Sequence, residues 1–193
     1  LQDMVRIHLR VGRPLESFHE HFAIQLNDTH PSIAVAELMR ILLDDYGFEW
    51  ERAWGVTTRS LAYTNHTLLP EALETWPVDL LSDVLPRPME IIYEINRRFI
   101  DELRVRFPGC DDLVRRLSLI DEDHGRRVRM AHLAIVGSHA VNGVAALHTE
   151  LLKSLVVADF HALWPEKFSN KTNGVTPRRF VALSNRGLTR LVS

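Results

Sequence analysis

The stretch Phe22–Pro31, which reads FAIQLNDTHP, joins a short apolar run to a polar cluster and then to a proline. The run Phe22–Leu26 has the length and composition of a buried strand. Pro31 suits the first turn of a helix, and apolar residues at helical spacing follow as far as Gly47, a residue type that often ends helices. A strand followed by a helix, with polar residues at the junction, predicts an α/β fold with a candidate site at the carboxyl end of the strand.

Periodicity, prolines and glycines predict the remaining elements in the same way. These are a helix near Trp50–Arg59, a strand at Leu61–Tyr63, a helix that opens after Pro70, an amphipathic helix containing Ile92–Leu103 that stops at Pro108-Gly109, a helical face from Val144 to Leu155, and a last helix capped by Thr176 with Pro177 in its first turn. The run Leu133–Gly137 is compatible with a third strand or with a buried helix. The order predicts a helix-rich α/β fold.

The composition excludes several classes of function. The chain has 193 residues, with 46% hydrophobic and 25% charged residues, which is ordinary for a soluble globular protein. A formal net charge of −2 gives no electrostatic reason to expect nucleic acid as a partner. No apolar run approaches the roughly 20 residues that span a membrane. Cys110 is the only cysteine, which fits a reducing compartment and leads us to expect a cytoplasmic protein. Because Leu1 is not an initiator Met, the chain is also expected to be a piece of a longer one.

Three patches are dense in Asn, Thr and His, namely Asn27–Pro31, Thr64–Thr67 and Asn170–Arg179. These side chains combine hydrogen-bond donors and acceptors without necessarily carrying a charge. That chemistry suits a ligand rich in hydroxyl groups, such as a sugar. Two of the patches follow predicted strands, where open α/β sheets bind their ligands.

Each patch also has a purely structural interpretation. Asp28 or Thr29 is of the type that caps a helix, whereas capping needs no imidazole and so does not explain His30. The alternative interpretation of His66 is a structural histidine whose ring nitrogens form hydrogen bonds with its neighbours. Glu71 and Glu74 are expected to be solvated rather than to form the acid and nucleophile of a glycosidase.

Other groups of reactive residues carry little weight. His19-Glu20-His21 lacks the spacing of a helical zinc motif, so no metal site is expected. The pair Ser138-His139 does not establish a hydrolase triad, because adjacency in sequence says nothing about a hydrogen bond between the two side chains. Arg178-Arg179 follow a glycine-containing loop and open a helix, so a phosphate role for them stays open.

Five stretches resemble the glycogen, starch and maltodextrin phosphorylases, and the similarity extends over nearly the whole chain. They are Ala23–Pro31 (AIQLNDTHP), Ala62–Leu73 (AYTNHTLLPEAL), Ile91–Phe99 (IIYEINRRF), Met130–Val144 (MAHLAIVGSHAVNGV) and Lys167–Arg179 (KFSNKTNGVTPRR). Five long motifs in the right order make a specific resemblance, unlike any single motif above.

The resemblance implies a two-domain glycosyltransferase of the GT-B type that uses pyridoxal 5′-phosphate. Such an enzyme cleaves the terminal α-1,4 bond of a glucan with inorganic phosphate and releases glucose 1-phosphate. It is further expected to be a cytoplasmic homodimer that works in glycogen metabolism, in a family that includes allosteric enzymes.

The resemblance also assigns roles to individual residues. His66 is expected at the reaction centre, where it and Asn173 contact the 6-hydroxyl of glucose. Asn65 and Thr67 are expected in the same pocket. The remaining expected contacts to sugar come from Asp28, His30 and Glu74.

The resemblance covers only part of the family's length. Residues 1–173 resemble the second half of its N-terminal domain, and residues 174–193 the crossover into its C-terminal domain. Phe180 stands where many members have a Trp beside the cofactor. Neither Lys153, Lys167 nor Lys171 sits in the family's cofactor-lysine motif, so no covalently bound cofactor is expected on this chain.

Two alternatives to a phosphorylase fragment remain at this stage. One is a non-catalytic glucan-binding or regulatory domain that kept the sugar pocket and lost the cofactor lysine. The other is a nucleotide-sugar glycosyltransferase of similar fold, which is not expected to share the Asn27–Pro31 and Lys171–Gly174 patches. A cofactor lysine elsewhere in the parent chain would distinguish an enzyme from a binding module.

Overall fold

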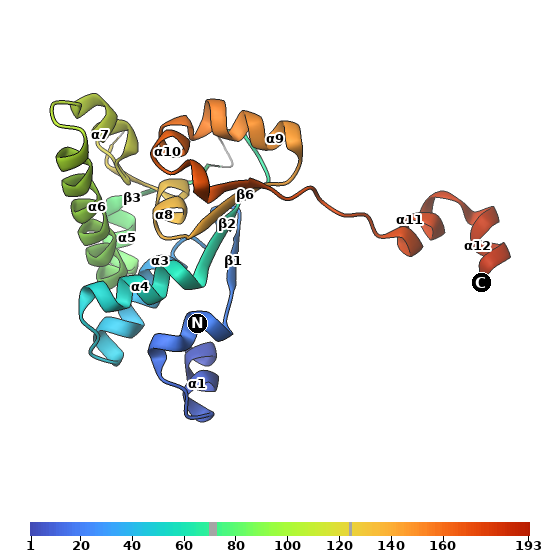
Figure 1. Cartoon of the computed structure of the whole chain (residues 1–193), viewed down its shortest axis with the longest axis horizontal. Helices are drawn as coiled ribbons and strands as arrows, with labels where there is room; N and C mark the ends of the chain where they lie inside the picture. Colours follow the sequence, from blue (N-terminus) through green and yellow to red (C-terminus); the bar gives the residue numbers. More distant parts are fainter. Residues whose placement is uncertain (70–72, 124) are drawn as a thin grey trace.

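A parallel sheet of four strands forms the centre of the molecule (Figure 1). The computed structural model describes residues 1–69, 73–123 and 125–193. The strands are β1 (Ile24–Asn27), β2 (Leu61–Thr64), β6 (Ala140–Gly143) and β7 (Phe168–Asn170), and they lie in the order β1-β2-β6-β7. Each neighbouring pair is parallel, so all four carboxyl ends lie at one edge of the sheet. The strands predicted at the first two positions are confirmed.

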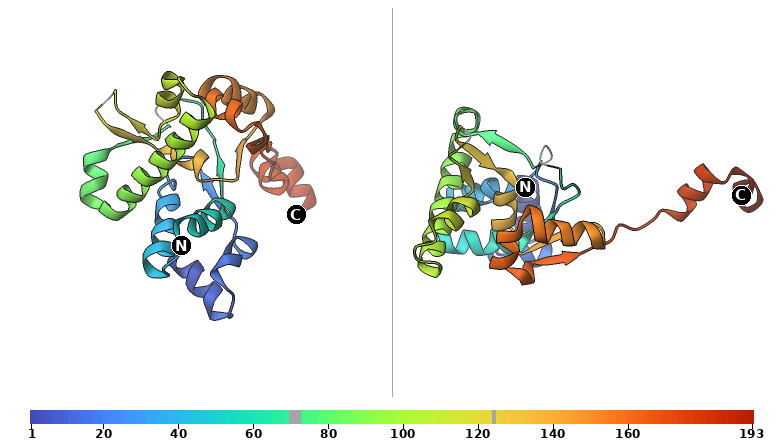
Figure 2. Two further views of the ribbon diagram at one scale, coloured as in Figure 1. Left: turned by 60° about the vertical axis from the view of Figure 1, so that its left-hand side comes forward. Right: turned by 90° about the horizontal axis from the view of Figure 1, so that it is seen from above.

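Helices surround this sheet (Figures 1 and 2). They are α1 (Gln2–Arg10), α2 (Phe18–His21), α3 (Ala34–Arg40), α4 (Trp50–Ser60), α5 (Val78–Val84), α6 (Pro86–Arg106), α7 (Asp111–Leu117), α8 (Met130–Val136), α9 (Ala146–Leu151) and α10 (Ala158–Leu163), with short 3₁₀ turns at Leu15–Ser17 and Pro165–Lys167. Helices α3 and α9 each continue into a π-helical turn, Ile41–Asp45 and Leu152–Val156. The helix-rich α/β class predicted from the sequence is therefore confirmed.

A second, three-stranded sheet was not predicted. It is antiparallel, with the order β3 (Thr75–Pro77), β5 (Arg127–Arg129) and β4 (Ile120–Asp121). The prediction of a helix that opens after Pro70 begins at residues 70–72, which lie outside the described residues. The chain beyond them forms β3 instead, and the next helix, α5, begins after Pro77.

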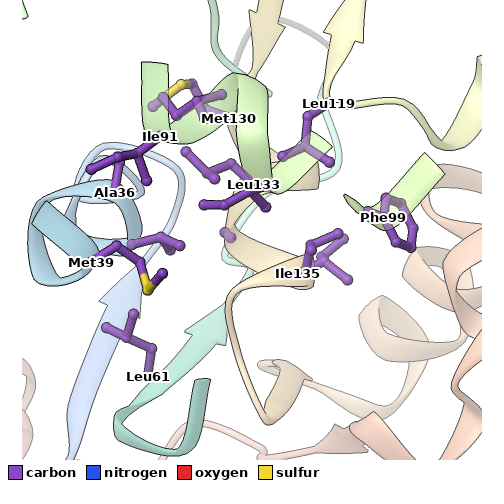
Figure 3. Close-up of a cluster of buried hydrophobic side chains, with 14 of the residues drawn as sticks. Ala36, Met39, Leu61, Ile91, Phe99, Leu119, Met130, Leu133 and Ile135 are labelled. Carbon is purple, nitrogen blue, oxygen red and sulfur yellow. The ribbon is translucent and has the colours of Figure 1, made fainter. Parts of the chain in front are cut away.

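The ambiguous run Leu133–Gly137 is helical, and the third strand of the large sheet lies just after it. Helix α8 is buried all round, with Leu133, Ala134 and Ile135 each fully inaccessible. A helix enclosed on every side has no polar face, which explains why its sequence shows no 3.6-residue period. Figure 3 shows Leu133 of α8 between Ile91 of α6 and Ile135, which lies toward Phe99.

The C-terminal helices α11 (Pro177–Ser184) and α12 (Arg186–Val192) stand away from the sheet at the end of an extended segment (Figures 1 and 2). Their apolar side chains are uncovered, with Leu183 75% and Leu191 82% exposed. Thr176 occupies the N-cap position of α11 and Pro177 lies in its first turn, as predicted, but the Thr176 side chain accepts no capping hydrogen bond. Asn185 caps α12 instead, by accepting from the amide of Leu188.

Among the described residues, no helix is both long enough and apolar enough to cross a membrane.

Candidate functional site

The three polar patches of the sequence all begin at the carboxyl edge of the large sheet. Asn27 ends β1, Thr64 ends β2 and Asn170 ends β7. Since the strands are parallel and adjacent in the sheet, their polar continuations emerge side by side. The sequence predicted this position for two patches. The third was not assigned to a strand, because β7 is only three residues long.

Asp28 holds the loop after β2 in place. Its φ is +58°, a left-handed conformation that Asp tolerates better than most residues. The Asp28 amide donates to the carbonyl of Thr64 at 2.8 Å, and its carboxylate accepts from the amide of His66 at 2.7 Å. Asp28 thus links the β1 and β2 loops, and the helix-capping interpretation is wrong for it, because α3 begins several residues later without any side-chain cap.

The imidazole of His66 is exposed at this edge and points back to β1. Its Nε2 lies 3.3 Å from the Oδ1 of Asn27. With its amide bound to Asp28, His66 is anchored at both main chain and side chain while remaining accessible. Such an arrangement presents a polar, hydrogen-bonding ring to a ligand at the strand ends.

Glu74 contacts the two residues that follow Asp28. One of its carboxylate oxygens, Oε2, accepts from the hydroxyl of Thr29 at 2.8 Å and lies 3.2 Å from Nδ1 of His30. The Glu74 side chain is 26% exposed, so the expectation that it is simply solvated is wrong. His30 is well exposed, and its contact with Glu74 is an ion pair only when the imidazole is protonated.

Asn65 is the buried member of the group. It is only 1% exposed, its amide donates to the carbonyl of Asn142 at 2.9 Å, and its side-chain Nδ2 donates to the hydroxyl of Tyr63 at 3.2 Å. Burial raises the pKa of Tyr63 to about 12, so this phenol stays neutral at physiological pH. The buried Oδ1 of Asn65 has no hydrogen-bond partner among the described residues, and it is therefore an acceptor free to be satisfied by a ligand or water.

Thr67 and Asn173 are less closely joined to the rest. Thr67 accepts from the amide of Leu69 at 3.4 Å within its own turn. The amide of Asn173 donates to the carbonyl of Val144 at 3.0 Å, which places Asn173 just beyond the paired ends of β6 and β7. Its side chain is exposed. The structure thus brings Asp28, His66 and Asn65 together, and it places Asn173 at the same edge of the sheet.

Strand β6 contributes a residue that the sequence analysis did not select. Asn142 accepts from the hydroxyl of Thr64 at 2.9 Å, and this hydroxyl in turn accepts from Gln25 at 2.7 Å. A polar chain therefore runs across three strands. The sequence indication of Asn142 was its position in the phosphorylase-like stretch Met130–Val144. The sequence analysis gave Asn142 no role.

Helix α9 closes this side of the edge. Burial lowers the pKa of His148, and the neighbouring His66 lowers it further, so His148 is neutral at physiological pH. A Cβ at Gly143 would lie 2.4 Å from Oγ1 of Thr149 and 2.6 Å from Nδ1 of His148. Glycine is therefore required for α9 to approach β6 this closely.

A comparison with known proteins tests the resemblance that the sequence suggested. A family model described as carbohydrate phosphorylase matches residues 1–193. The chain belongs to the carbohydrate phosphorylase family. Within that family it is similar to the glycogen phosphorylase of Synechocystis sp. (strain ATCC 27184 / PCC 6803 / Kazusa), with 62% identity over all 193 residues, and to the muscle form of glycogen phosphorylase of Bos taurus, with 56% identity over 178 residues, or 92% of the chain.

The chain spans 23% of the length of the Synechocystis relative and 21% of the Bos taurus relative. The chain is also 56% identical to the muscle form of glycogen phosphorylase of Homo sapiens, over 92% of the chain and 21% of that relative. These proportions agree with a chain that corresponds to one portion of a carbohydrate phosphorylase.

The remaining candidate residues of the sequence analysis lie away from the strand-end loops. Phe180, the one residue expected beside pyridoxal phosphate, lies on α11, half exposed and away from the strand ends. In the part of the chain that the structure describes, no three His, Cys, Asp or Glu side chains are grouped to hold a metal ion. Ser138 and His139 form no dyad, since Nδ1 of His139 faces the carbonyl of Thr58 at 3.3 Å and the Ser138 hydroxyl has no partner.

Proposed function

We propose that this chain forms the glucosyl-binding side of an α-glucan phosphorylase. The complete enzyme would cleave terminal α-1,4 bonds of glycogen, starch or maltodextrin with inorganic phosphate and release glucose 1-phosphate. The observation that carries the proposal is the convergence of Asp28, Asn65 and His66 at one sheet edge, in a chain 62% identical to a glycogen phosphorylase. Hydroxyl-rich ligands are bound by hydrogen-bond donors and acceptors of the kinds found there.

In this proposal, His66 is the residue closest to the reaction. Its imidazole would hydrogen-bond the glucose 6-hydroxyl together with Asn173, and its main-chain carbonyl would face the cationic sugar of the transition state. The Asp28 carboxylate has a positioning role, because it already accepts the amide of His66. The unpartnered Oδ1 of Asn65 supplies a further acceptor for a donor on the ligand.

Glu74 and His30 would act further along the glucan. Their 3.2 Å contact orders the loop after β1, and Thr29 strengthens it through a 2.8 Å hydrogen bond to the same carboxylate oxygen. Thr67, on the turn after His66, would line the pocket. This division separates the groups that touch the reacting glucosyl unit from those that hold the loops around it.

The cofactor belongs to the complete enzyme in this proposal. Pyridoxal 5′-phosphate would supply its phosphate as a proton relay to the substrate phosphate, and none would bind covalently to the chain itself. The GT-B architecture, the domain boundary near residue 173, the homodimer and a cytoplasmic location are proposed with it.

Ligand binding at the strand ends can be tested on the chain itself. Amide NMR spectra recorded during titration with maltopentaose are expected to shift the signals of His66, Asn65 and Asn173. The variant His66→Ala should weaken binding, whereas His139→Ala, which removes an exposed histidine at the other end of β6, should not. Shifts confined to residues outside the strand-end loops would contradict the proposed site.

Activity provides a second test. The chain alone is expected neither to release glucose 1-phosphate from glucan nor to bind pyridoxal phosphate stoichiometrically. Borohydride trapping with the cofactor followed by peptide mapping, and an assay for glucose 1-phosphate, would check both points. One stoichiometrically trapped lysine together with phosphorolysis would overturn the assignment of the cofactor to another part of the enzyme.

A further inference from the structure

The two residues proposed to bind the glucose 6-hydroxyl are held in different ways. His66 is positioned by its own contacts, from its amide to Asp28 and from its ring to Asn27. Asn173 has an exposed side chain, and the hydrogen bond that holds it runs from its main-chain amide to the carbonyl of Val144 at 3.0 Å. The place of Asn173 therefore depends on the place of Val144.

Helix α9 reaches Val144 through the imidazole of His148. The amide of Val144 donates to Nδ1 of His148, with 3.4 Å between the two nitrogens. A neutral imidazole whose proton is on Nε2 has the lone pair on Nδ1 that this contact needs. Among the described residues the buried Nε2 has no hydrogen-bond partner, so the ring acts on its surroundings through Nδ1. Val144 is thus held at its amide by His148 and at its carbonyl by Asn173.

The same helix meets the segment before Asn173 at a second point. Oγ1 of the buried Thr149 lies 3.0 Å from Oδ1 of Asn170, whose Nδ2 donates to the hydroxyl of Thr172 at 3.0 Å. The amide of Lys171 donates to the carbonyl of Gly143, also at 3.0 Å. Figure 1 shows α9 beside the end of β6, where the chain leaves the sheet toward α11. The segment that carries Asn173 therefore leaves the sheet along α9.

His148 also faces the other half of the proposed site. Burial is the main cause that lowers its pKa, His66 lowers it further, and Asp28 raises it, so both residues are close enough to act on its charge. Strand β6 lies between β2, which carries His66, and β7, which leads to Asn173. A side chain above the end of β6 is accordingly the one placed to align the two halves.

We propose that His148 is a positioning residue of the glucan site, which fixes Val144 through Nδ1 and thereby sets the place of Asn173 relative to His66. The inference rests on the proposed function and adds a residue that the sequence analysis gave no role. It requires no contact between His148 and the sugar. An apolar side chain could pack against β6 in its place but could not accept from the Val144 amide, so the role depends on the acceptor.

The test compares His148→Asn with His148→Gln in the intact chain. The Oδ1 of asparagine can take the place of Nδ1, whereas the longer glutamine side chain reaches only toward the place of Nε2. We expect His148→Gln to speed amide hydrogen exchange at Val144 and Asn173 about fivefold or more, and to weaken maltopentaose binding roughly two- to tenfold, because one hydrogen bond is lost. His148→Asn should keep both properties near those of the unmodified chain. Leu147→Ala is the matched control, since Leu147 is the neighbouring residue of α9 and is 73% exposed.

A spectroscopic measurement on the unmodified chain tests the same point without any variant. The ¹⁵N shifts of the His148 ring should show Nδ1 unprotonated and Nε2 protonated at pH 7.5. The opposite tautomer would overturn the proposal, because a protonated Nδ1 cannot accept from Val144. Rescue by His148→Gln rather than by His148→Asn would overturn it as well.

Two further outcomes separate this inference from the proposed function. If maltopentaose does not bind the unmodified chain, but exchange at Asn173 responds to the variants as expected, the proposed ligand is wrong and the positioning of Asn173 by His148 stands. If maltopentaose binds, but His148→Gln changes neither exchange nor affinity, the positioning role is overturned and the proposed function stands.

Discussion

The amide of His66 donates to the Asp28 carboxylate at 2.7 Å, and together with the 3.3 Å contact of its ring with Asn27 this hydrogen bond positions the imidazole relative to β1. Hydrogen bonds to a charged acceptor are stronger than neutral ones and contribute about 1.5–3 kcal/mol each. At the scale of single residues, the site is thus built from main-chain groups bound by side chains. The side chains of His66 and Asn173, which would contact the ligand, are exposed, whereas Asn65 is buried.

Substitution of the proposed ligand-contacting residues is expected to slow catalysis in the complete phosphorylase. His66→Ala and Asn173→Ala should each reduce kcat/KM by roughly ten- to a hundredfold, since a lost hydrogen bond to a buried sugar hydroxyl costs about 1–3 kcal/mol. Steady-state kinetics with a maltooligosaccharide would measure this. His139→Ala is the control, because its ring faces the carbonyl of Thr58 outside the strand-end loops. A larger loss for His139→Ala than for both others would contradict the site.

His132 is expected to make the stability of the chain depend on pH. Burial lowers its pKa to about 4, with Arg129 as the second cause, and its Nδ1 lies 3.0 Å from the carbonyl of Ser118. Between pH 6.5 and 4 the unfolded chain binds a proton that the folded chain does not. The contribution of His132 to the free energy of unfolding should therefore be present in full above pH 6.5. It should be lost progressively as the pH falls from 6.5 to 4.

Urea denaturation of the unmodified chain and of His132→Gln would measure that dependence. The glutamine variant should lose the decline between pH 6.5 and 4, while both proteins should lose stability at lower pH. Glu94 contributes there, since its hydrogen bonds from Arg97 and Arg98 hold its pKa at about 2. Parallel curves for the two proteins above pH 4 would assign the decline to other groups.

Between elements, the closest approach at the site is that of β6 to α9. Gly143→Ala is expected to destabilise the chain by about 1–3 kcal/mol, because the added methyl would overlap Thr149 and the backbone at its Cα. The α9 helix would have to move away from the sheet edge, which should also weaken ligand binding. Thermal unfolding and the maltopentaose titration would record the two effects.

Gly174→Ala provides the matched control for this prediction. Nothing lies within 4 Å of a Cβ at Gly174, and its φ is not in the left-handed region. The control should therefore change the melting temperature by little. Equal destabilisation by the two substitutions would mean that the contact between Gly143 and Thr149 does not limit the packing.

Some helices and strands could be predicted from the sequence better than others. Strands β1 and β2 and helix α6 were predicted because each has a clear period or is bounded by glycine or proline. Helix α8 was ambiguous because it is buried all round. The two- and three-residue strands β3, β4, β5 and β7 are too short for any period to develop, and pairing with distant segments defines them. The sequence also predicted Asp28 and His66 as site residues, because both follow recognisable strands. It could not show that Asn142 lies between them and Asn170, because the pairing of distant strands determines that position.

At the scale of the whole molecule, the C-terminal helices are the segment with the least cover. Residues 174–193 are expected to exchange amide hydrogens fastest, because Leu183 and Leu191 are exposed and a short helix is marginal without burial. Hydrogen exchange on dilute, monomeric chain should show low protection after Gly174 and high protection in α6. Equal protection of both segments would show that the domain boundary proposed near residue 173 is misplaced.

The sequence separation of the site's contacts has a consequence for how the chain folds. Asp28 and His66 are 38 residues apart, and Gln25 and Thr64 are 39 apart, whereas Thr64 and Asn142 are separated by 78. Doubling a loop adds only about 0.6 kcal/mol to its closure, but long-range parallel pairing slows folding markedly. The β1–β2 half can therefore form while the segment from α5 to α8 is still unfolded. The main-chain amide of Asn65 gains its partner on Asn142 only when β6 docks, so we expect the proposed ligand site to be completed only after that step.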